Sequence, residues 1–200
     1  MVCQMPHSTK LRFIQILPNA SISGDYILRD LPGSGKRIDL LCRVLAASFE
    51  WAPVTWPKQD IEVIAIIADS KVLRFQLPEE IGVWGEKTWA QFIKEALKGN
   101  PPSFVSVLDG NLEQIINELN NPPNSKVWVL HEEGEMLDFD ILPFAGSDNS
   151  FMLGDHKGFN SKAEELISKH ALQKVSLGNT SYLSSHCVGN IIAEFERKVK

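Results

Sequence analysis

The chain has 200 residues, 44% hydrophobic and 22% charged, which suits one domain or at most two small ones with a proper core. Its formal net charge of −5 excludes strong attraction of the whole surface to nucleic acid, so any RNA-binding surface has to be a local patch. No apolar run approaches the ~20 residues of a membrane span, and the first residues, MVCQMPHSTK, lack the apolar stretch of a secretory signal.

The cysteines are odd in number and far apart in the sequence. Cys3, Cys42 and Cys187 form no Cys-x-x-Cys pair, which argues against a disulfide framework and against a zinc site. We therefore expect a cytoplasmic, reduced protein.

The first predicted elements are a strand and a helix. RFIQIL, residues 12–17, is an apolar run ended by Pro18, which predicts a buried strand. Residues 38–49 carry apolar side chains at helical spacing, which predicts an amphipathic helix. Asp39 and Arg43 would share its opposite face as an exposed i, i+4 pair.

Between these two elements lies the glycine-rich segment LRDLPGSGKRIDLLCR, residues 28–43. A phosphate-binding P-loop needs a glycine five residues before its Gly-Lys pair and a Ser or Thr after it. Here Asp30 stands at the glycine position and Arg37 follows Lys36. Magnesium would lose its hydroxyl ligand and the carboxylate would repel phosphates, so an ATPase is not expected.

The same segment can still bind an anion. Free N–H groups and the helix dipole favour negative charge where a glycine-rich turn enters a helix. The cations Arg29, Lys36, Arg37 and Arg43 make it the best candidate for a local RNA-binding patch. Taken alone, the pattern favours the plainer alternative, a solvated loop before a helix.

The next segments predict a hairpin and a second helix. Residues 61–68, IEVIAIIA, form a nearly continuous β-branched run, typical of a strand covered on both faces. Residues 72–77 are a plausible hairpin partner. Residues 88–99 are predicted to form an amphipathic helix closed by Gly99.

After Pro101 and Pro102 the predicted strands and helices alternate, which favours an α/β sheet that is at least partly parallel. In SKAEELISKH, Ser161 is the candidate helix cap, and Glu164 would complete a capping box. The elements predicted in this half are helices over 112–121, 161–170 and 184–200 and strands over 126–132, 150–156 and 172–178.

Three of the later strands end in small or polar residues that could form one pocket. Ligands of open α/β sheets bind beyond the carboxyl ends of the strands. Gly154 and Gly178 would let a ligand approach the backbone closely. His131, His156 and His186 lack a characteristic ligand spacing, so no metal is expected.

Three motifs together resemble a known family. LRDLPGSGKRIDLLCR, FMLGDHKGF and VSLGNTSYLSSHC are similar in order and spacing to segments of the tRNA pseudouridine N1-methyltransferases, of the SPOUT superfamily, from about Phe13 to Lys198. The resemblance implies one α/β domain over residues 1–200, with a mostly parallel sheet flanked by helices. It also implies a tail of residues 1–11, a C-terminal trefoil knot in about 126–200, and a homodimer.

The resemblance further implies where substrates bind. S-adenosylmethionine would lie in the knot, and tRNA would meet the glycine-rich segment; no metal is implied. The residues expected at the donor site are Leu130, Gly154, Leu177, Gly178, Asn179, Thr180, Ser181, Tyr182 and Cys187. Those expected to face RNA are Lys36, Arg37, Asp39 and Arg43. Asp155, His156 and Asp39 are unranked candidates for the group that removes the N1 proton.

The chain departs from the family pattern in two places. Lys36 stands where family members have glycine, and in residues 178–184 a Ser-Pro pair and a His-Ala pair are replaced. Two alternatives therefore stay open beside pseudouridine N1-methylation. One is the same fold and donor with a different RNA acceptor, and the other is a non-catalytic RNA-binding relative.

Overall fold

The computed structural model describes residues 9–51, 56–140, 142 and 146–199, and these form an α/β fold. The strands are β1 (Leu11–Leu17), β2 (Ile61–Ile67), β3 (Lys71–Phe75), β4 (Val105–Asp109), β5 (Ser125–Met136), β6 (Asp148–Leu153) and β7 (Gln173–Ser176). The helices are α1 (Ile38–Leu45), α2 (Gly85–Leu97), α3 (Leu112–Asn120), α4 (Ser161–Lys169) and α5 (Ser184–Val199). A π-helical turn, η1 (Ala46–Glu50), follows α1, and a short 3-10 turn, η2 (Lys58–Asp60), precedes β2.

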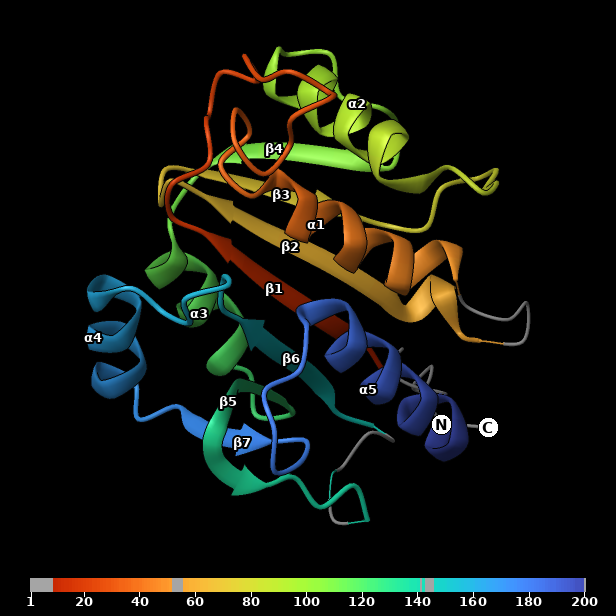
Figure 1. The fold of residues 1–200 in the computed structure, drawn as a ribbon. Coiled ribbons are helices and arrows are strands. Elements are labelled where there is room, and N and C mark those ends of the chain that lie inside the picture. Colours follow the sequence, from red (N-terminus) through yellow and green to blue (C-terminus); the bar gives the residue numbers. More distant parts are fainter. Residues whose placement is uncertain (1–8, 52–55, 141, 143–145, 200) are drawn as a thin grey trace, which may run out of the picture.

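The strands of the described residues form one seven-stranded sheet, in the order β4-β3-β2-β1-β6-β5-β7 (Figure 1). β1 pairs in parallel with β2 and β6, and β5 pairs in parallel with β6 and β7. β3 and β4 extend the β2 side in antiparallel pairs, as the predicted hairpin requires. The sheet is therefore mostly parallel, and its parallel strands end at the same edge.

Helices cover both faces of the sheet. α1, α2 and α5 share a core with Phe13 and Leu17, whereas α3 and α4 share a second core with Ile14 and Ile16. Successive residues of β1 thus alternate between two buried cores, which explains why its sequence is nearly continuously apolar. In Figure 1, α1 and α5 cross in front of the sheet.

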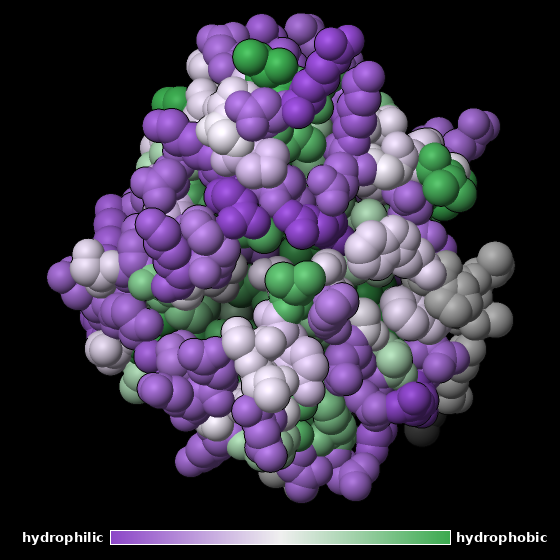
Figure 2. All heavy atoms as spheres, in the orientation of Figure 1, coloured by the Kyte–Doolittle hydropathy of each residue, from purple (hydrophilic) through white to green (hydrophobic). Residues whose placement is uncertain are grey.

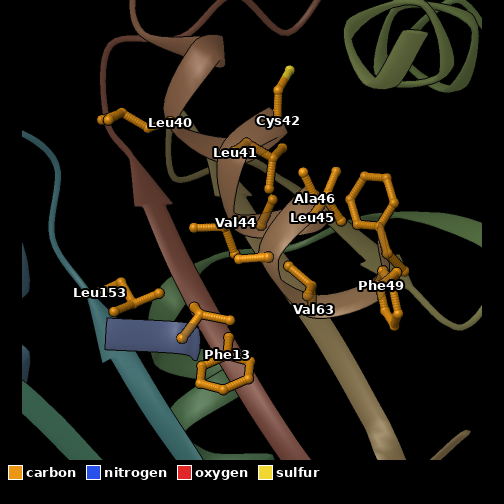
Figure 3. Close-up of a cluster of buried hydrophobic side chains, with 14 of the residues drawn as sticks. Phe13, Leu40, Leu41, Cys42, Val44, Leu45, Ala46, Phe49, Val63 and Leu153 are labelled. Carbon is orange, nitrogen blue, oxygen red and sulfur yellow. The ribbon is translucent and has the colours of Figure 1, made fainter. Parts of the chain in front are cut away.

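The helix predicted over residues 38–49 is confirmed, but its last part winds differently. The α-helix ends at Leu45, and the chain continues as η1 to Glu50. Figure 3 shows Val44 between α1 and the strands that carry Phe13 and Val63, while Cys42 points away from the sheet. Burial there raises the pKa of the Cys42 thiol above its ordinary value.

The other elements begin or end within a few residues of their predicted bounds, with one omission. α2 begins at Gly85, before the predicted start, and ends near Gly99, which has a φ of 88°. β4, with the sequence VSVLD, is not predicted; it is a short strand in which only Val105 is buried. Residues 1–8 of the expected tail, with Cys3, lie outside the described residues, and Leu11 already begins β1.

The predicted cap of α4 is wrong by one residue. Asn160, not Ser161, is the N-cap, because its extended backbone leaves its side-chain oxygen free to accept the N–H of Ala163. Ser161 already belongs to the helix. Glu164 is therefore not part of a capping box with Ser161, and its carboxylate accepts from Lys174 at 2.9 Å.

Candidate functional site

A cavity of about 750 Å³ lies beside the carboxyl ends of β6 and β7 and the middle of β5. Leu130 of β5, Gly154 after β6 and Leu177 after β7 all form part of its wall. The strand ends predicted to form one pocket thus line one cavity, at the edge where parallel sheets bind ligands. Leu40 of α1 and Cys187 of α5 also line it.

The first part of the wall follows from an irregularity in β5. Leu130 pairs with Val175 of β7, but the next paired residue, Glu135, faces Val175 again. Residues 131–134 therefore leave the ladder. A Cβ atom on Gly134 would lie 2.6 Å from the backbone of Val175, so this crossing of β5 over β7 requires a glycine.

The second part of the wall is a closed turn after β6. The Asp155 N–H donates to the Gly158 carbonyl and the Gly158 N–H donates to the Asp155 carbonyl, both at 3.1 Å. The Asp155 carboxylate also accepts the N–H of Lys157 at 2.7 Å. A Cβ atom on Gly154 would lie 2.8 Å from the Gly158 backbone, so the turn folds directly back on Gly154.

The third part of the wall is the loop after β7. The Ser176 hydroxyl donates to the Gly178 carbonyl at 2.6 Å and accepts the Gly178 N–H at 3.2 Å. The Tyr182 hydroxyl would lie 2.8 Å from a Cβ atom on Gly178, so the ring folds back over this glycine. Residues 180–182 face the cavity as a result.

A smaller hollow of about 280 Å³ adjoins the cavity on the side of the glycine-rich loop. Arg37, Asp155 and His156 line both spaces, and Lys36 lines the smaller one. The Nδ1 atom of His156 lies 3.8 Å from the Asp155 carboxylate, whose side chain is 9% exposed. A carboxylate and an imidazole thus stand between the two hollows.

The glycine-rich loop is held in a tight conformation. The Asp30 carboxylate accepts the N–H groups of Gly33 and Ser34, at 3.1 and 2.9 Å. Lys36 and Arg37 follow with φ angles of 46° and 76°, a left-handed conformation that is rare for residues with side chains. The loop therefore stores backbone strain next to the smaller hollow.

Asp39 holds the arginines of this segment. Both oxygens of its carboxylate accept from Arg37, each at 3.1 Å, and one also pairs with Arg43. The expected i, i+4 pair of Asp39 and Arg43 is present, but it is not exposed. The Asp39 side chain is 2% exposed, because the two guanidinium groups cover it.

The predicted site residues fall into three groups by place. Those that line the larger cavity are Arg37, Leu130, Gly154, Asp155, His156, Leu177, Thr180, Ser181, Tyr182 and Cys187. Lys36 lines only the smaller hollow. Gly178 and Asn179 belong to the loop after β7 and Asp39 and Arg43 to α1, and none of the four is part of either lining.

The cavity also contains residues that sequence reasoning does not find. Leu40 lines it from α1, although helical spacing identifies Leu40 only as a core position. Lys157 lines it next to the predicted Gly-Asp-His run, and proximity to that run is the signal for it. Cys187, a predicted site residue, is 9% exposed, and its burial raises the pKa of its thiol to about 11.

Three histidines surround the cavity, namely His131, His156 and His186. In the part of the chain that the structure describes, no three His, Cys, Asp or Glu side chains are arranged to hold a metal ion. No helix among the same residues is long and apolar enough to cross a membrane. The face in Figure 2 is mainly hydrophilic, with hydrophobic atoms at the surface near its centre.

Comparison with known proteins gives consistent matches. The family model described as "Putative SAM-dependent RNA methyltransferase" matches residues 11–199. A tRNA (pseudouridine(54)-N(1))-methyltransferase of Methanococcoides burtonii is 28% identical over 94% of this chain and 96% of its own length. A second enzyme of the same name, from Thermococcus kodakarensis, is 31% identical over 88% of this chain and 93% of its own length. A solved structure, Archaeoglobus fulgidus Nep1 bound to S-adenosylhomocysteine, has the same fold with a TM-score of 0.64, 15% identity and coverage of 94% and 97%.

Proposed function

Because this chain belongs to the family of SAM-dependent RNA methyltransferases, we propose that it transfers the methyl group of S-adenosylmethionine to N1 of a pseudouridine in tRNA. The names of its archaeal relatives give position 54, and we propose the same target here. The observation that carries the proposal is the pair of adjoining hollows with Asp155 and His156 between them. One hollow suits the donor, and the other suits the target nucleotide.

The larger cavity fits a donor of this size and chemistry. Its volume lies within the roughly 300–1,000 Å³ of small-ligand sites, and its wall mixes leucines with backbone-rich loops. Its lining holds two carboxylates, of Glu132 and Asp155, and two cations, Arg37 and Lys157, so it offers partners for both the sulfonium and the carboxylate of the donor. When bound, S-adenosylmethionine supplies an electrophilic methyl group. The residues that would hold it are Leu130, Gly154, Leu177, Thr180, Ser181, Tyr182 and Cys187, with Gly178 and Asn179 supporting the third loop.

The smaller hollow would take the target nucleotide, turned out of its stack. Lys36 and Arg37 line it and would bind RNA phosphate or the base edge. Asp39 and Arg43 would contribute by bracing Arg37, since Asp39 accepts from both arginines. Positioning of this kind can lower a reaction barrier by ~7–11 kcal/mol.

Methylation at N1 requires that the N1–H proton leaves as the new N–C bond forms. Asp155 and His156 line both hollows, so either can accept that proton. Such assistance typically gives about 10²–10⁴-fold in rate. Asp39 is a weaker candidate, because both of its carboxylate oxygens already accept from arginine side chains.

We also propose a single domain over residues 1–200 with a trefoil knot in about 126–200. The slipped pairing of β5 with β7 supports this, because β7 contacts β5 on both sides of the 131–134 segment. Lys198 at the end of α5 donates to Asp140 at 2.7 Å, which ties the last helix to the connection after β5. In a trefoil knot the C-terminal part of the chain passes through a loop. These two contacts bring β7 and α5 against the 131–134 segment and the connection after β5, which would form that loop.

A homodimer in the cytoplasm completes the proposal. Tyr182 and Leu183, 50% and 54% exposed, place apolar surface at the cavity wall, and a second copy would cover it. The cytoplasm is proposed because the substrate, tRNA, is used there. No metal has a part in the proposed reaction.

The test is transfer of labelled methyl from S-adenosylmethionine to two tRNAs that differ only at position 54, pseudouridine in one and uridine in the other. Label in the pseudouridine tRNA alone is the expected result. Label in both, or in the uridine tRNA, would overturn N1 of pseudouridine as the target. Donor binding without label in either would point to another RNA acceptor, and neither donor binding nor label would point to a non-catalytic RNA-binding protein.

A further inference from the structure

Gln15 is a polar residue in an otherwise apolar position. It lies in β1, where it pairs with Ala65 of β2 and with Leu153 of β6, and it is 0% exposed. Its place in the alternation of β1 puts it on the same sheet face as Phe13 and Leu17, which belong to the core under α1 and α5. Core packing alone would favour an aliphatic side chain there.

The amide group of Gln15 faces main-chain carbonyls. Its Nε2 lies 2.9 Å from the Gly154 oxygen, 3.2 Å from the Ile16 oxygen and 3.4 Å from the Leu153 oxygen. Since only the NH₂ end can donate, this fixes the orientation of the amide. The Oε1 atom has no hydrogen-bond partner among the described residues, although an unpaired buried oxygen costs free energy.

The bond to Gly154 acts on the cavity wall. The peptide between Gly154 and Asp155 is planar, so a held Gly154 carbonyl also sets the direction of the Asp155 N–H. That N–H closes the turn by donating to the Gly158 carbonyl. Gly154 has no side chain to fix its conformation, and glycine backbone is the most permissive. The Gln15 amide supplies the constraint that Gly154 lacks.

We propose that Gln15 is a positioning residue for the donor cavity. Its amide donates to the Gly154 carbonyl and so holds the start of the 154–158 turn in place. This inference rests on the proposed function of that cavity. It explains why a polar side chain with an unpaired oxygen is kept in the core. Gln15 acts through Gly154 and Asp155, and it does not itself line either hollow.

The test compares Gln15→Met, an apolar side chain of similar size, with wild type and with Ser48→Ala. Ser48 is a matched control, since it is equally buried and donates to the Val44 carbonyl at 2.9 Å outside the cavity wall. Calorimetry with S-adenosylhomocysteine should give a dissociation constant about tenfold higher for Gln15→Met and an unchanged one for Ser48→Ala. The affinity for tRNA should stay within about twofold of wild type in both.

Hydrogen exchange without any donor gives a second measurement. The amides of Asp155 and Gly158 should exchange faster in Gln15→Met while the sheet amides keep their protection. If Gln15→Met does not fold, Gln15→Asn replaces it, because its amide is one methylene too short to reach Gly154. Unchanged donor affinity and unchanged exchange would overturn the inference. A wild-type protein that binds no donor would instead overturn the proposed function, and the exchange data would still decide the role of Gln15.

Discussion

At the scale of single residues, Lys36 combines a strained backbone with an unpaired positive charge. Its φ of 46° is in the left-handed region, where side chains are disfavoured by about 1–2 kcal/mol. The side chain is exposed and, among the described residues, makes no hydrogen bond or ion pair. Arg37 gives the smaller hollow a second cation, against one carboxylate, that of Asp155, so the hollow carries a net positive charge suited to an anion.

The first prediction concerns Lys36→Gly. Glycine relieves the strain, so the free energy of unfolding should be unchanged or up to about 1 kcal/mol higher. tRNA affinity should fall several-fold, and the slope of log affinity against log salt should decrease by about 1, because one phosphate contact is lost. Filter binding over a salt series measures both effects.

Ala171→Gly is the matched control for Lys36→Gly. Ala171 has a φ of 48°, so glycine relieves a similar strain, but the residue follows α4 and lines neither hollow. It should gain stability without any change in tRNA binding. Equal tRNA affinity in Lys36→Gly and wild type would show that the lysine has no contact with RNA.

The second prediction concerns the residues between the two hollows. Asp155→Asn keeps an oxygen that can accept the Lys157 N–H, and His156→Gln keeps a polar side chain of similar reach. Whichever of the two accepts the proton, its loss should lower the single-turnover rate by about 10²–10⁴-fold, with the affinity for S-adenosylhomocysteine, which lacks the sulfonium charge, little changed. Asp25→Asn, at an exposed residue paired with Lys98, serves as the control. Near-full rates in both variants would remove both residues as the base.

At the scale of elements, mutations can test which residue is the N-cap of α4. Asn160→Ala removes the side-chain acceptor of the Ala163 N–H and should lower the free energy of unfolding by about 1 kcal/mol. Ser161→Ala, one residue later, should change it by less than about 0.5 kcal/mol. Chemical denaturation of both variants measures the difference. A larger loss in Ser161→Ala would reverse the assignment of the cap.

Strands were predictable wherever both faces are buried. β2 is a continuous β-branched run in the sequence because it lies between two cores, and its pattern alone identifies it. β4 has a weaker signal, because Val105 and Val107 alternate with a polar residue over only five positions and its other apolar residue, Leu108, is exposed. The cap at Asn160 was missed because Asn and Ser are both good caps, and only the backbone conformation distinguishes them.

The sequence predicts which strand ends meet at the site. It does not predict which side chains pair there. Parallel strands end at one edge, so Leu130, Gly154 and Leu177 could be expected to come together. The burial of Asp39 could not, because helical periodicity places it opposite the apolar residues and does not reveal the two arginines over it. The role of Gln15 was likewise hidden, since its nearest acceptor is the main-chain carbonyl of Gly154, 139 positions later in the sequence.

At the scale of the whole molecule, stability should depend on alkaline pH through Cys187. Its folded pKa of about 11 exceeds the ordinary value of 9.0, so the thiol stabilises the fold fully below pH 9. As the pH rises from 9 to 11, the unfolded thiol ionises while the folded one stays protonated, and stability falls by up to about 1.4 kcal/mol per pH unit.

The prediction compares Cys187→Ala with wild type in denaturant titrations between pH 8 and 11. The variant should start less stable, because a buried side chain is shortened, but its stability should fall less steeply above pH 9. The buried thiol of Cys42 is present in both proteins and cancels in the comparison. Parallel curves would show that the Cys187 thiol is not shielded as the structure indicates.

The position of β1 at the centre of the sheet has a consequence during synthesis. Arg12 contacts Glu62 of β2 only 50 positions later, but Lys10, just before β1, contacts Asp148, 138 positions later. Ribosomes add ~5–20 residues per second, so one edge of β1 waits roughly 7–28 s for its partner strand β6. During that time the nascent chain presents unpaired backbone groups to any neighbouring polypeptide, a target for chaperones and for wrong pairing alike.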